Sequence, residues 1–133
     1  MTFAQRRVAQ ALVESALVLP LVVTLSLGVL QVVLYAHAHD VLTSAVQEGA
    51  RLAAEDGRRL DEGYARAEAL VRAGLGTSVE VVHLEVTLDD DLVAVVVDGR
   101  MRPILPLPVV GGLPIHAQSY VSRERFRPAG GGR

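Results

Sequence analysis

Glu14 is the side chain whose chemistry is most informative, because it opens a long apolar run. No residue from Ser15 to Ala36 carries a formal charge. As a helix this run would be roughly 33 Å long, against a bilayer hydrocarbon core of about 30 Å. Insertion of a carboxylate on such a helix costs about 2.5–3.5 kcal/mol at the middle of the membrane. The cost is smaller near the end of the helix, where Glu14 lies. Glu14 is therefore either an interfacial residue favoured by the helix dipole or a group that meets a cation from elsewhere.

The other polar clusters do not predict a metal site or a cofactor. His37 and His39 are two residues apart, so they point to different sides of a helix and do not readily share a metal ion. The run 89–91 is three aspartates, which could hold calcium, but it lacks the glycine and the distant glutamate of a calcium loop. We expect a solvated turn there. The chain has no cysteine, which excludes disulfides and thiolate metal sites.

No constellation typical of an enzyme is present. Three serines lie on the predicted long helix, and the others do not fall in a nucleophile motif. Paired carboxylates occur only at helix ends and turns. The formal net charge of −2 gives no support to a nucleic-acid partner. We therefore expect a non-enzymatic protein. The serines are Ser15, Ser26, Ser44, Ser78, Ser119 and Ser122.

A long helix over residues 10–54 must position Glu14. Its first part is apolar on every side, whereas its second part is apolar along one stripe, which suits packing against a small head. Pro20 removes one backbone hydrogen bond in the apolar part, so we expect a kink near residues 17–19. Gly49 is expected to allow close packing on a sheet. The stripe consists of Ala38, Val41, Leu42, Ala45, Gly49, Leu52 and Ala53.

The rest of the chain predicts a short helix and a small antiparallel sheet. A helix over residues 58–73 would be stopped by Gly74 and Gly76. Apolar alternation and β-branched residues predict strands over 82–88, 92–102 and 115–125. Within the second strand we expect a bulge at Gly99. The proline-rich loop 103–114 cannot be helical, and packing on the sheet is expected, with a contact to another subunit as the alternative.

The fold class is therefore α+β. A long N-terminal helix has a membrane-spanning lower half, and a short helix and a three-stranded antiparallel sheet pack on its upper half. The expected division is a leader over 1–9, a transmembrane helix over 10–36, an extracytoplasmic head over 37–127 and a disordered tail over 128–133. Arg6 and Arg7 next to the apolar run favour a cytoplasmic N-terminus, with the C-terminus outside. Tyr35 is expected to anchor the helix at the membrane interface.

This plan is that of a pilin, and two blocks of sequence carry a family resemblance. The run from Gln10 to Pro20, with Glu14 in register, resembles the opening of TadE-like proteins, the pseudopilins of tight-adherence (Flp-type, type IVc) pili. Residues 46–54, Val-Gln-Glu-Gly-Ala-Arg-Leu-Ala-Ala, resemble the family's second block at the top of the long helix. Weaker similarity follows over residues 95–106 and 122–124.

The resemblance implies processing by a prepilin peptidase on the cytoplasmic side of the membrane. The cut would fall between Ala9 and Gln10; the family usually has glycine at the position of Ala9. Glu14 would then be the fifth residue of the mature chain, where pilin-like proteins keep a glutamate. Its carboxylate would pair with the free α-amino group of a neighbouring subunit and so set the stagger between subunits.

The implied function is that of a minor pilin or pseudopilin, a structural or initiating subunit of a tight-adherence pilus. Such pili serve adhesion and surface attachment, and related assemblies serve DNA uptake or secretion. The implied partners are the prepilin peptidase, other pilin subunits, the assembly platform in the inner membrane and lipid. The implied location is the inner membrane, with possible incorporation into an extracellular pilus.

Two alternatives from other classes stay open. The first is a secreted domain whose signal peptide is cut after Ala38, because residues 36–38 fit the small-residue rule of signal peptidase. Against it, the apolar segment is longer than the usual 7–15 residues. The second is an unprocessed membrane-anchored binding domain.

Overall fold

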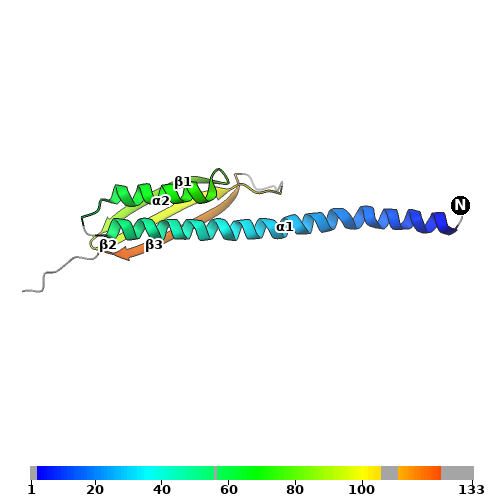
Figure 1. Cartoon of the computed structure of the whole chain (residues 1–133), viewed down its shortest axis with the longest axis horizontal. Coiled ribbons are helices and arrows are strands. Elements are labelled where there is room, and N and C mark those ends of the chain that lie inside the picture. The colour runs from blue at the N-terminus through cyan, green and yellow to red at the C-terminus, as the bar shows by residue number, and fades with distance from the viewer. Residues whose placement is uncertain (1–2, 56, 106–110, 124–133) are drawn as a thin grey trace, which may run out of the picture.

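The computed structural model describes residues 3–55, 57–105 and 111–123. Five elements follow one another along the chain: α1 (Phe3–Ala54), α2 (Leu60–Leu75), β1 (Val79–Asp89), β2 (Leu92–Met101) and β3 (Leu113–Ser122). The strands form one antiparallel sheet in the order β1-β2-β3. Figure 1 shows α2 and the second half of α1 lying along this sheet, while the first half of α1 projects away from it. The predicted α+β architecture is confirmed.

α1 is a single helix that runs through Pro20 without interruption. Residues 3–9, which lie in the predicted leader 1–9, belong to the same helix. The hydroxyl of Thr24 donates to the carbonyl of Pro20 and that of Ser26 donates to the carbonyl of Val22, each at 2.8 Å. These polar side chains are therefore satisfied within the helix and impose no polar surface on the apolar segment.

α2 begins and ends two residues later than predicted. Arg59 is its N-cap, and Gly76, with φ 53°, is its C-cap, where a left-handed conformation suits glycine. Gly74 lies inside the helix rather than ending it. Arg58 pairs with Glu62 at 2.7 Å in the first turn of α2. The hydrogen bond and the charge of Glu62 raise the pKa of the Arg58 guanidinium.

The sheet is regular along β2, and its bulge lies in β1. The register shifts between Val81 and His83, so Val82 is the extra residue, and the bulge predicted at Gly99 is wrong. Gly99 pairs in register with Ile115. A Cβ at Gly99 would lie 3.0 Å from Val79 Cγ1 and 3.1 Å from the carbonyl oxygen of Glu80. Because glycine has no side chain, Val79 and Glu80 pack closely against the backbone of Gly99.

The core lies between the sheet and the two helices. One face of β2 is fully buried, and the second half of α1 covers it, as the stripe of small and apolar residues predicts. Dispersion and burial of these side chains supply most of the head's stability. The largest fully buried side chains are Leu42, Val46, Val93, Val95 and Val97.

Asp90 and Asp91 form the turn between β1 and β2, as predicted, whereas Asp89 is the last residue of β1 and pairs with Leu92. Asp90 has a positive φ of 50°, which aspartate tolerates better than most residues. The backbone N–H of Arg123, just after β3, donates to the carbonyl of Asp91 at 2.6 Å. β3 begins earlier and ends earlier than predicted, and residues 124 and 125 of the predicted strand lie outside the described residues, as does the predicted tail over 128–133.

Candidate assembly and membrane-anchoring segment

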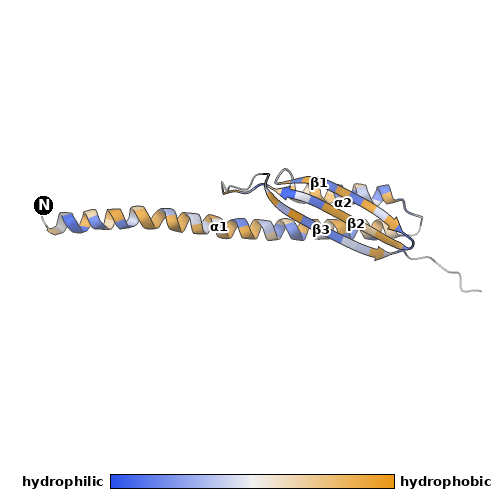
Figure 2. Ribbon diagram, turned by 180° about the vertical axis from the view of Figure 1, so that it is seen from behind, coloured by the Kyte–Doolittle hydropathy of each residue, from blue (hydrophilic) through white to orange (hydrophobic). Residues whose placement is uncertain are grey.

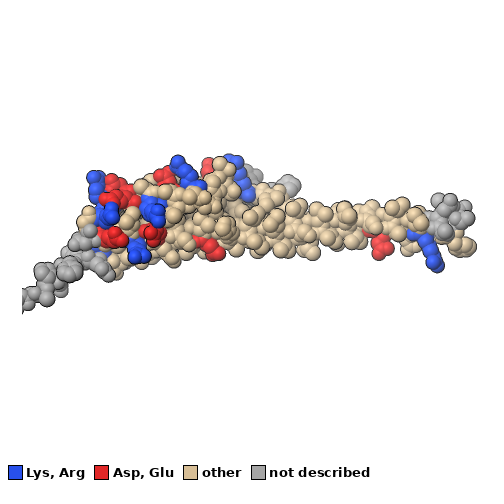
Figure 3. All heavy atoms as spheres, viewed as in Figure 1, with Lys and Arg blue, Asp and Glu red and all other residues tan. Residues whose placement is uncertain are grey.

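The first half of α1 is apolar and uncovered. Its large hydrophobic side chains from Leu12 to Val33, apart from the partly buried Leu27, are 45–71% exposed. Figure 2 shows hydrophobic colouring on this half of the helix, and Figure 3 shows a long stretch without charge between the head and the N-terminal end. Among the described residues, this is the one helix long and apolar enough to cross a membrane. A helix of a soluble core would be covered by the rest of its own chain. This segment is uncovered, so it is suited to an apolar environment outside its own chain.

Glu14 lies on this uncovered segment, far from the head. Its side chain is exposed, and it has no ion-pair partner among the residues that the structure describes. Figure 3 shows an acidic side chain by itself on the projecting part of α1. At 1.5 Å per residue, Glu14 is about 39 Å along the helix from Asp40. Its carboxylate is therefore available to a group outside its own chain.

Ala9 and Gln10 precede Glu14 on the same helix, and both are exposed. The bond between them lies inside α1, so the structure marks no boundary between a leader and a mature chain. Pro20 also lies within α1 and on the uncovered segment. The sequence-predicted residues thus share one projecting helix, and none of them contacts the core of the head.

Gln31 is a residue that the sequence reasoning missed. It is 7% exposed, although it belongs to the uncharged run of α1. Its Oε1 accepts a hydrogen bond of 2.7 Å from the backbone N–H of Ile104, which lies after β2. Its Nε2 is buried without a partner in the described part of the chain. The available signal was that Gln31 is the one amide side chain between Ser15 and Ala36.

The described start of the proline-rich loop packs on α1, not on the sheet as predicted. Ile104 is held by Gln31, and Leu105 lines an apolar groove with residues of α1. The residues of α1 in this groove are Leu21, Thr24, Leu25, Gly28, Val29 and Val32. Residues 106–110 of the loop lie outside the described residues. The loop packs on α1 because the buried Oε1 of Gln31 accepts a hydrogen bond from the loop backbone at Ile104.

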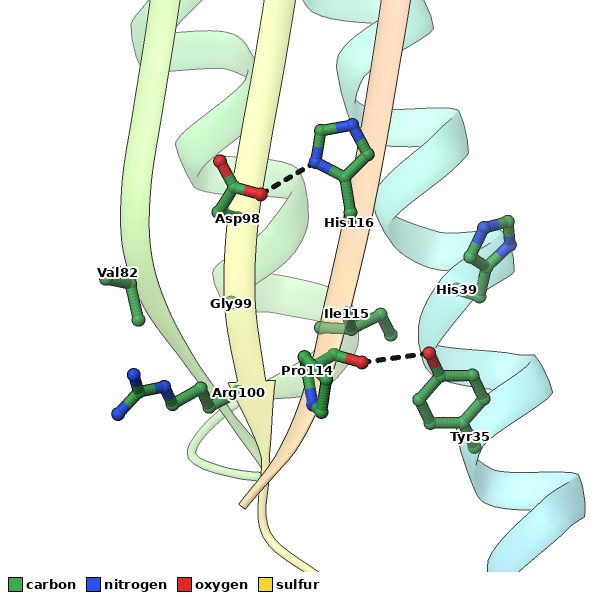
Figure 4. Close-up of a pocket in the computed structure, with 9 residues that line it drawn as sticks. All are labelled: Tyr35, His39, Val82, Asp98, Gly99, Arg100, Pro114, Ile115 and His116. Atoms are coloured by element: carbon green, nitrogen blue, oxygen red, sulfur yellow. Dashed lines mark hydrogen bonds and ion pairs between the residues drawn. The ribbon is translucent and has the colours of Figure 1, made fainter. Parts of the chain in front are cut away.

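The junction between α1 and the sheet is fixed by Tyr35. Its hydroxyl donates to the carbonyl of Pro114 at the start of β3, at 2.9 Å (Figure 4). Tyr35, predicted as a membrane-interface anchor, is half-buried and joins α1 to the edge of the sheet; its contact with a membrane stays a prediction. Leu34 and Tyr35 both pack against the core cluster. The head therefore begins on α1 at about residue 34.

A surface hollow beside this junction contains histidines and an aspartate. Nδ1 of His116 lies 2.7 Å from Oδ1 of Asp98 across neighbouring strands, and His39 faces the same hollow from α1 (Figure 4). Both partners of this pair are about half exposed. Within the described ranges, no three potential ligands come close enough to hold a metal ion. His37 and His39 are both exposed on α1 and lie on different sides of it.

Comparison with known proteins finds a family match over most of α1. No curated protein matches the chain. The model of the TadE-like protein family matches residues 9–51, a stretch that begins at Ala9 and contains Glu14, Pro20 and Gln31. The weaker similarities over 95–106 and 122–124 lie outside the matched residues and stay predictions. The match confirms the resemblance to TadE-like proteins over residues 9–51.

Proposed function

We propose that this protein is a minor pilin, or pseudopilin, that serves as a structural or initiating subunit of a tight-adherence pilus. The observation that carries the proposal is the division of α1 into an uncovered apolar half with Glu14 near its start and a second half buried in the head. A subunit of this shape is held in a membrane by the first half. The same half can pack with other subunits when it leaves the membrane.

The proposed role of Glu14 is to receive the α-amino group of a neighbouring subunit. Cleavage between Ala9 and Gln10 by a prepilin peptidase would create that group. An amine in an apolar bundle is costly without a partner, by several kcal/mol. The lack of an ion-pair partner for Glu14 in the described residues of its own chain supports an intermolecular role.

The proposed topology places the head outside the cytoplasm. Arg6 is exposed at the end of the apolar segment, and together with Arg7 it forms the basic flank that stays inside. Most of the charged side chains of the head lie at the opposite end of the molecule from these arginines (Figure 3). The subunit would reside in the inner membrane until the assembly platform incorporates it, with adhesion as the pilus function. Pilus assembly, rather than catalysis, is the proposed activity.

Cleavage after Ala38 is disfavoured by the packing of α1. Ala38 is 2% exposed and belongs to the core. Loss of residues 1–38 would remove the contacts of Gln31, Tyr35 and Ala38 with the rest of the head.

The deciding experiment measures the N-terminus of the mature protein from the native host. A chain that begins at Gln10 is expected, and Ala9→Gly should be cut at least as fast. A chain that begins at His39 would identify a secreted domain, and an intact chain would identify a permanent membrane anchor. Either result would overturn the pseudopilin proposal. A reporter fused after Arg133 should be active only outside the cytoplasm, and activity inside would contradict the topology.

A further inference from the structure

Residues 102–105, which follow β2, leave the sheet and contact the apolar half of α1 through Ile104 and Leu105. Figure 1 shows this segment reaching past the end of the sheet toward the projecting part of the helix. The backbone N–H of Ile104 donates to Oε1 of Gln31 at 2.7 Å, and Leu105 lines a groove on α1 between Leu21 and Val32. The contact therefore lies on the part of α1 that would be in the membrane.

The depth of the contact follows from helix geometry. Gln31 precedes Ala36, the end of the uncharged run, by five residues, which corresponds to about 7.5 Å along the helix. The groove residues of α1 from Leu21 to Val29 lie deeper still. If the uncharged run of α1 occupies the hydrocarbon layer, the backbone of Ile104 lies inside that layer. Non-helical backbone is tolerated at such depth only where its polar groups are satisfied by protein.

Gln31 meets this requirement for the N–H of Ile104. A glutamine in a membrane-spanning run is expensive unless it hydrogen-bonds, and here it is buried beneath the loop that it holds. The burial of Gln31 is thus explained by its hydrogen bond to the backbone of Ile104 and not by a contact within α1. The hydroxyls of Thr24 and Ser26, in contrast, bond within the helix and hold nothing else.

The side chains of the segment suit lipid. Ile104 is 49% exposed and adjoins the uncovered apolar surface of α1, and no charged residue occurs from Pro103 to Pro114. Arg100 and Arg102 precede this stretch, and both are exposed. Long cationic side chains at the edge of an apolar surface reach toward lipid headgroups. The apolar surface of Ile104 is therefore continuous with the surface that α1 would present to acyl chains.

We propose that Ile104 and Leu105 insert into the outer leaflet beside α1 and give the head a second contact with phospholipid. The hydrogen bond from Ile104 to Gln31 holds the segment at this depth. Two contacts instead of one fix the orientation of the head on the membrane before the subunit is extracted into a filament. This inference rests on the proposed membrane-spanning role of α1.

The test measures the depth of residue 104 in the full chain reconstituted into phosphatidylcholine vesicles. Because the protein has no cysteine, Ile104→Cys accepts a single environment-sensitive nitrobenzoxadiazole probe. Matched probes are placed by Val29→Cys, on α1, and by Thr87→Cys, exposed on β1 at the opposite end of the sheet. Aqueous iodide and lipids spin-labelled on the acyl chain are the two quenchers.

The probe at residue 104 is expected to be several-fold less sensitive to iodide than the probe at residue 87, and to be quenched by spin-labelled lipid. Iodide quenching equal to that at residue 87, with residue 29 still protected, would overturn this inference alone. Protection without lipid quenching would indicate a protein neighbour and would overturn it too. Iodide quenching at residue 29 would instead show that α1 does not span the bilayer, and the proposed function would fail.

The role of Gln31 is tested by adding Gln31→Leu to the probe at residue 104. Loss of the acceptor leaves the Ile104 N–H unpaired in the apolar layer, so iodide quenching is expected to rise several-fold. Ser26→Ala is the matched control, because Ser26 bonds only to its own helix, and it should leave the quenching unchanged. Unchanged quenching in Gln31→Leu would overturn the proposed anchoring by Gln31.

Discussion

Gly49 and Gly63 face each other where α1 meets α2, and neither position has room for a side chain. A Cβ on Gly49 would lie 2.9 Å from the carbonyl oxygen of Gly63, and a Cβ on Gly63 would lie 2.6 Å from the carbonyl oxygen of Gly49. Real Cβ atoms essentially never come this close to such neighbours. Gly49 thus serves packing against α2, and not against the sheet as the sequence suggested.

Alanine at either glycine is expected to destabilise the head. The backbones of α1 and α2 would have to separate, and overpacking of this kind costs typically 1–3 kcal/mol. Urea unfolding of the full chain in detergent, followed by circular dichroism, would show a lower midpoint for Gly49→Ala and Gly63→Ala. Gly28→Ala is the control, because a Cβ there meets nothing within 4 Å and alanine favours the helix. An unchanged midpoint for both head variants would contradict the close approach.

Sequence patterns predict most of this fold because the two halves of α1 and the strands of the sheet have distinct periodicities. The stripe with Ala38, Leu42 and Ala45 and the run of valines in β2 each indicate which face is buried. The errors occur where tertiary contacts decide. The bulge at Val82 and the place of Gly49 depend on how neighbouring backbones meet, which no local pattern encodes.

The candidate site was predicted in part for the same reason. Ala9, Gln10, Glu14 and Pro20 were identified by a motif along one helix, and the motif is local. Gln31 was missed because its meaning depends on Ile104, which is 73 residues away in the chain. A lone amide in an apolar run indicates that something polar approaches, but not which segment does.

The valines of β2 offer a test of which face of the sheet is buried. Val95 is fully buried beneath α1, whereas its neighbour Val96 lies half-buried on the opposite face. Val95→Ala is expected to lower the free energy of unfolding by about 2 kcal/mol, from lost burial and a cavity. Val96→Ala should cost clearly less. Hydrogen exchange of the β2 amides in the full chain measures both, and equal losses would argue against the assigned faces.

Tyr35 offers a test of the junction between α1 and the sheet. Tyr35→Phe keeps the ring but removes the hydroxyl that donates to the carbonyl of Pro114 at 2.9 Å. Loss of one hydrogen bond is expected to cost about 0.5–1.5 kcal/mol. The amides at the start of β3 should exchange faster, while those of α2, on the other side of the head, should not change. Tyr120→Phe is a suitable control, because Tyr120 is exposed and its hydroxyl bonds only to nearby Gln118. Equal exchange in Tyr35→Phe and the wild type would show that the ring alone holds the junction.

The final prediction concerns Glu14 and pilus assembly. Glu14→Ala should insert normally, since removal of a charge makes an apolar helix easier to embed, and its head should fold, since Glu14 lies about 39 Å from Asp40 along α1. The variant should accumulate in the inner membrane while pili are lost, because the α-amino group of the next subunit has no partner. Glu14→Asp should fall between, as its shorter side chain reaches less far.

Glu55→Ala, at the other end of α1 with an exposed pair to Arg58 at 3.7 Å, is the control and should assemble normally. Membrane immunoblots and electron microscopy of sheared pili measure these outcomes. Normal pili in Glu14→Ala cells would reduce Glu14 to an interfacial residue and leave assembly to the head.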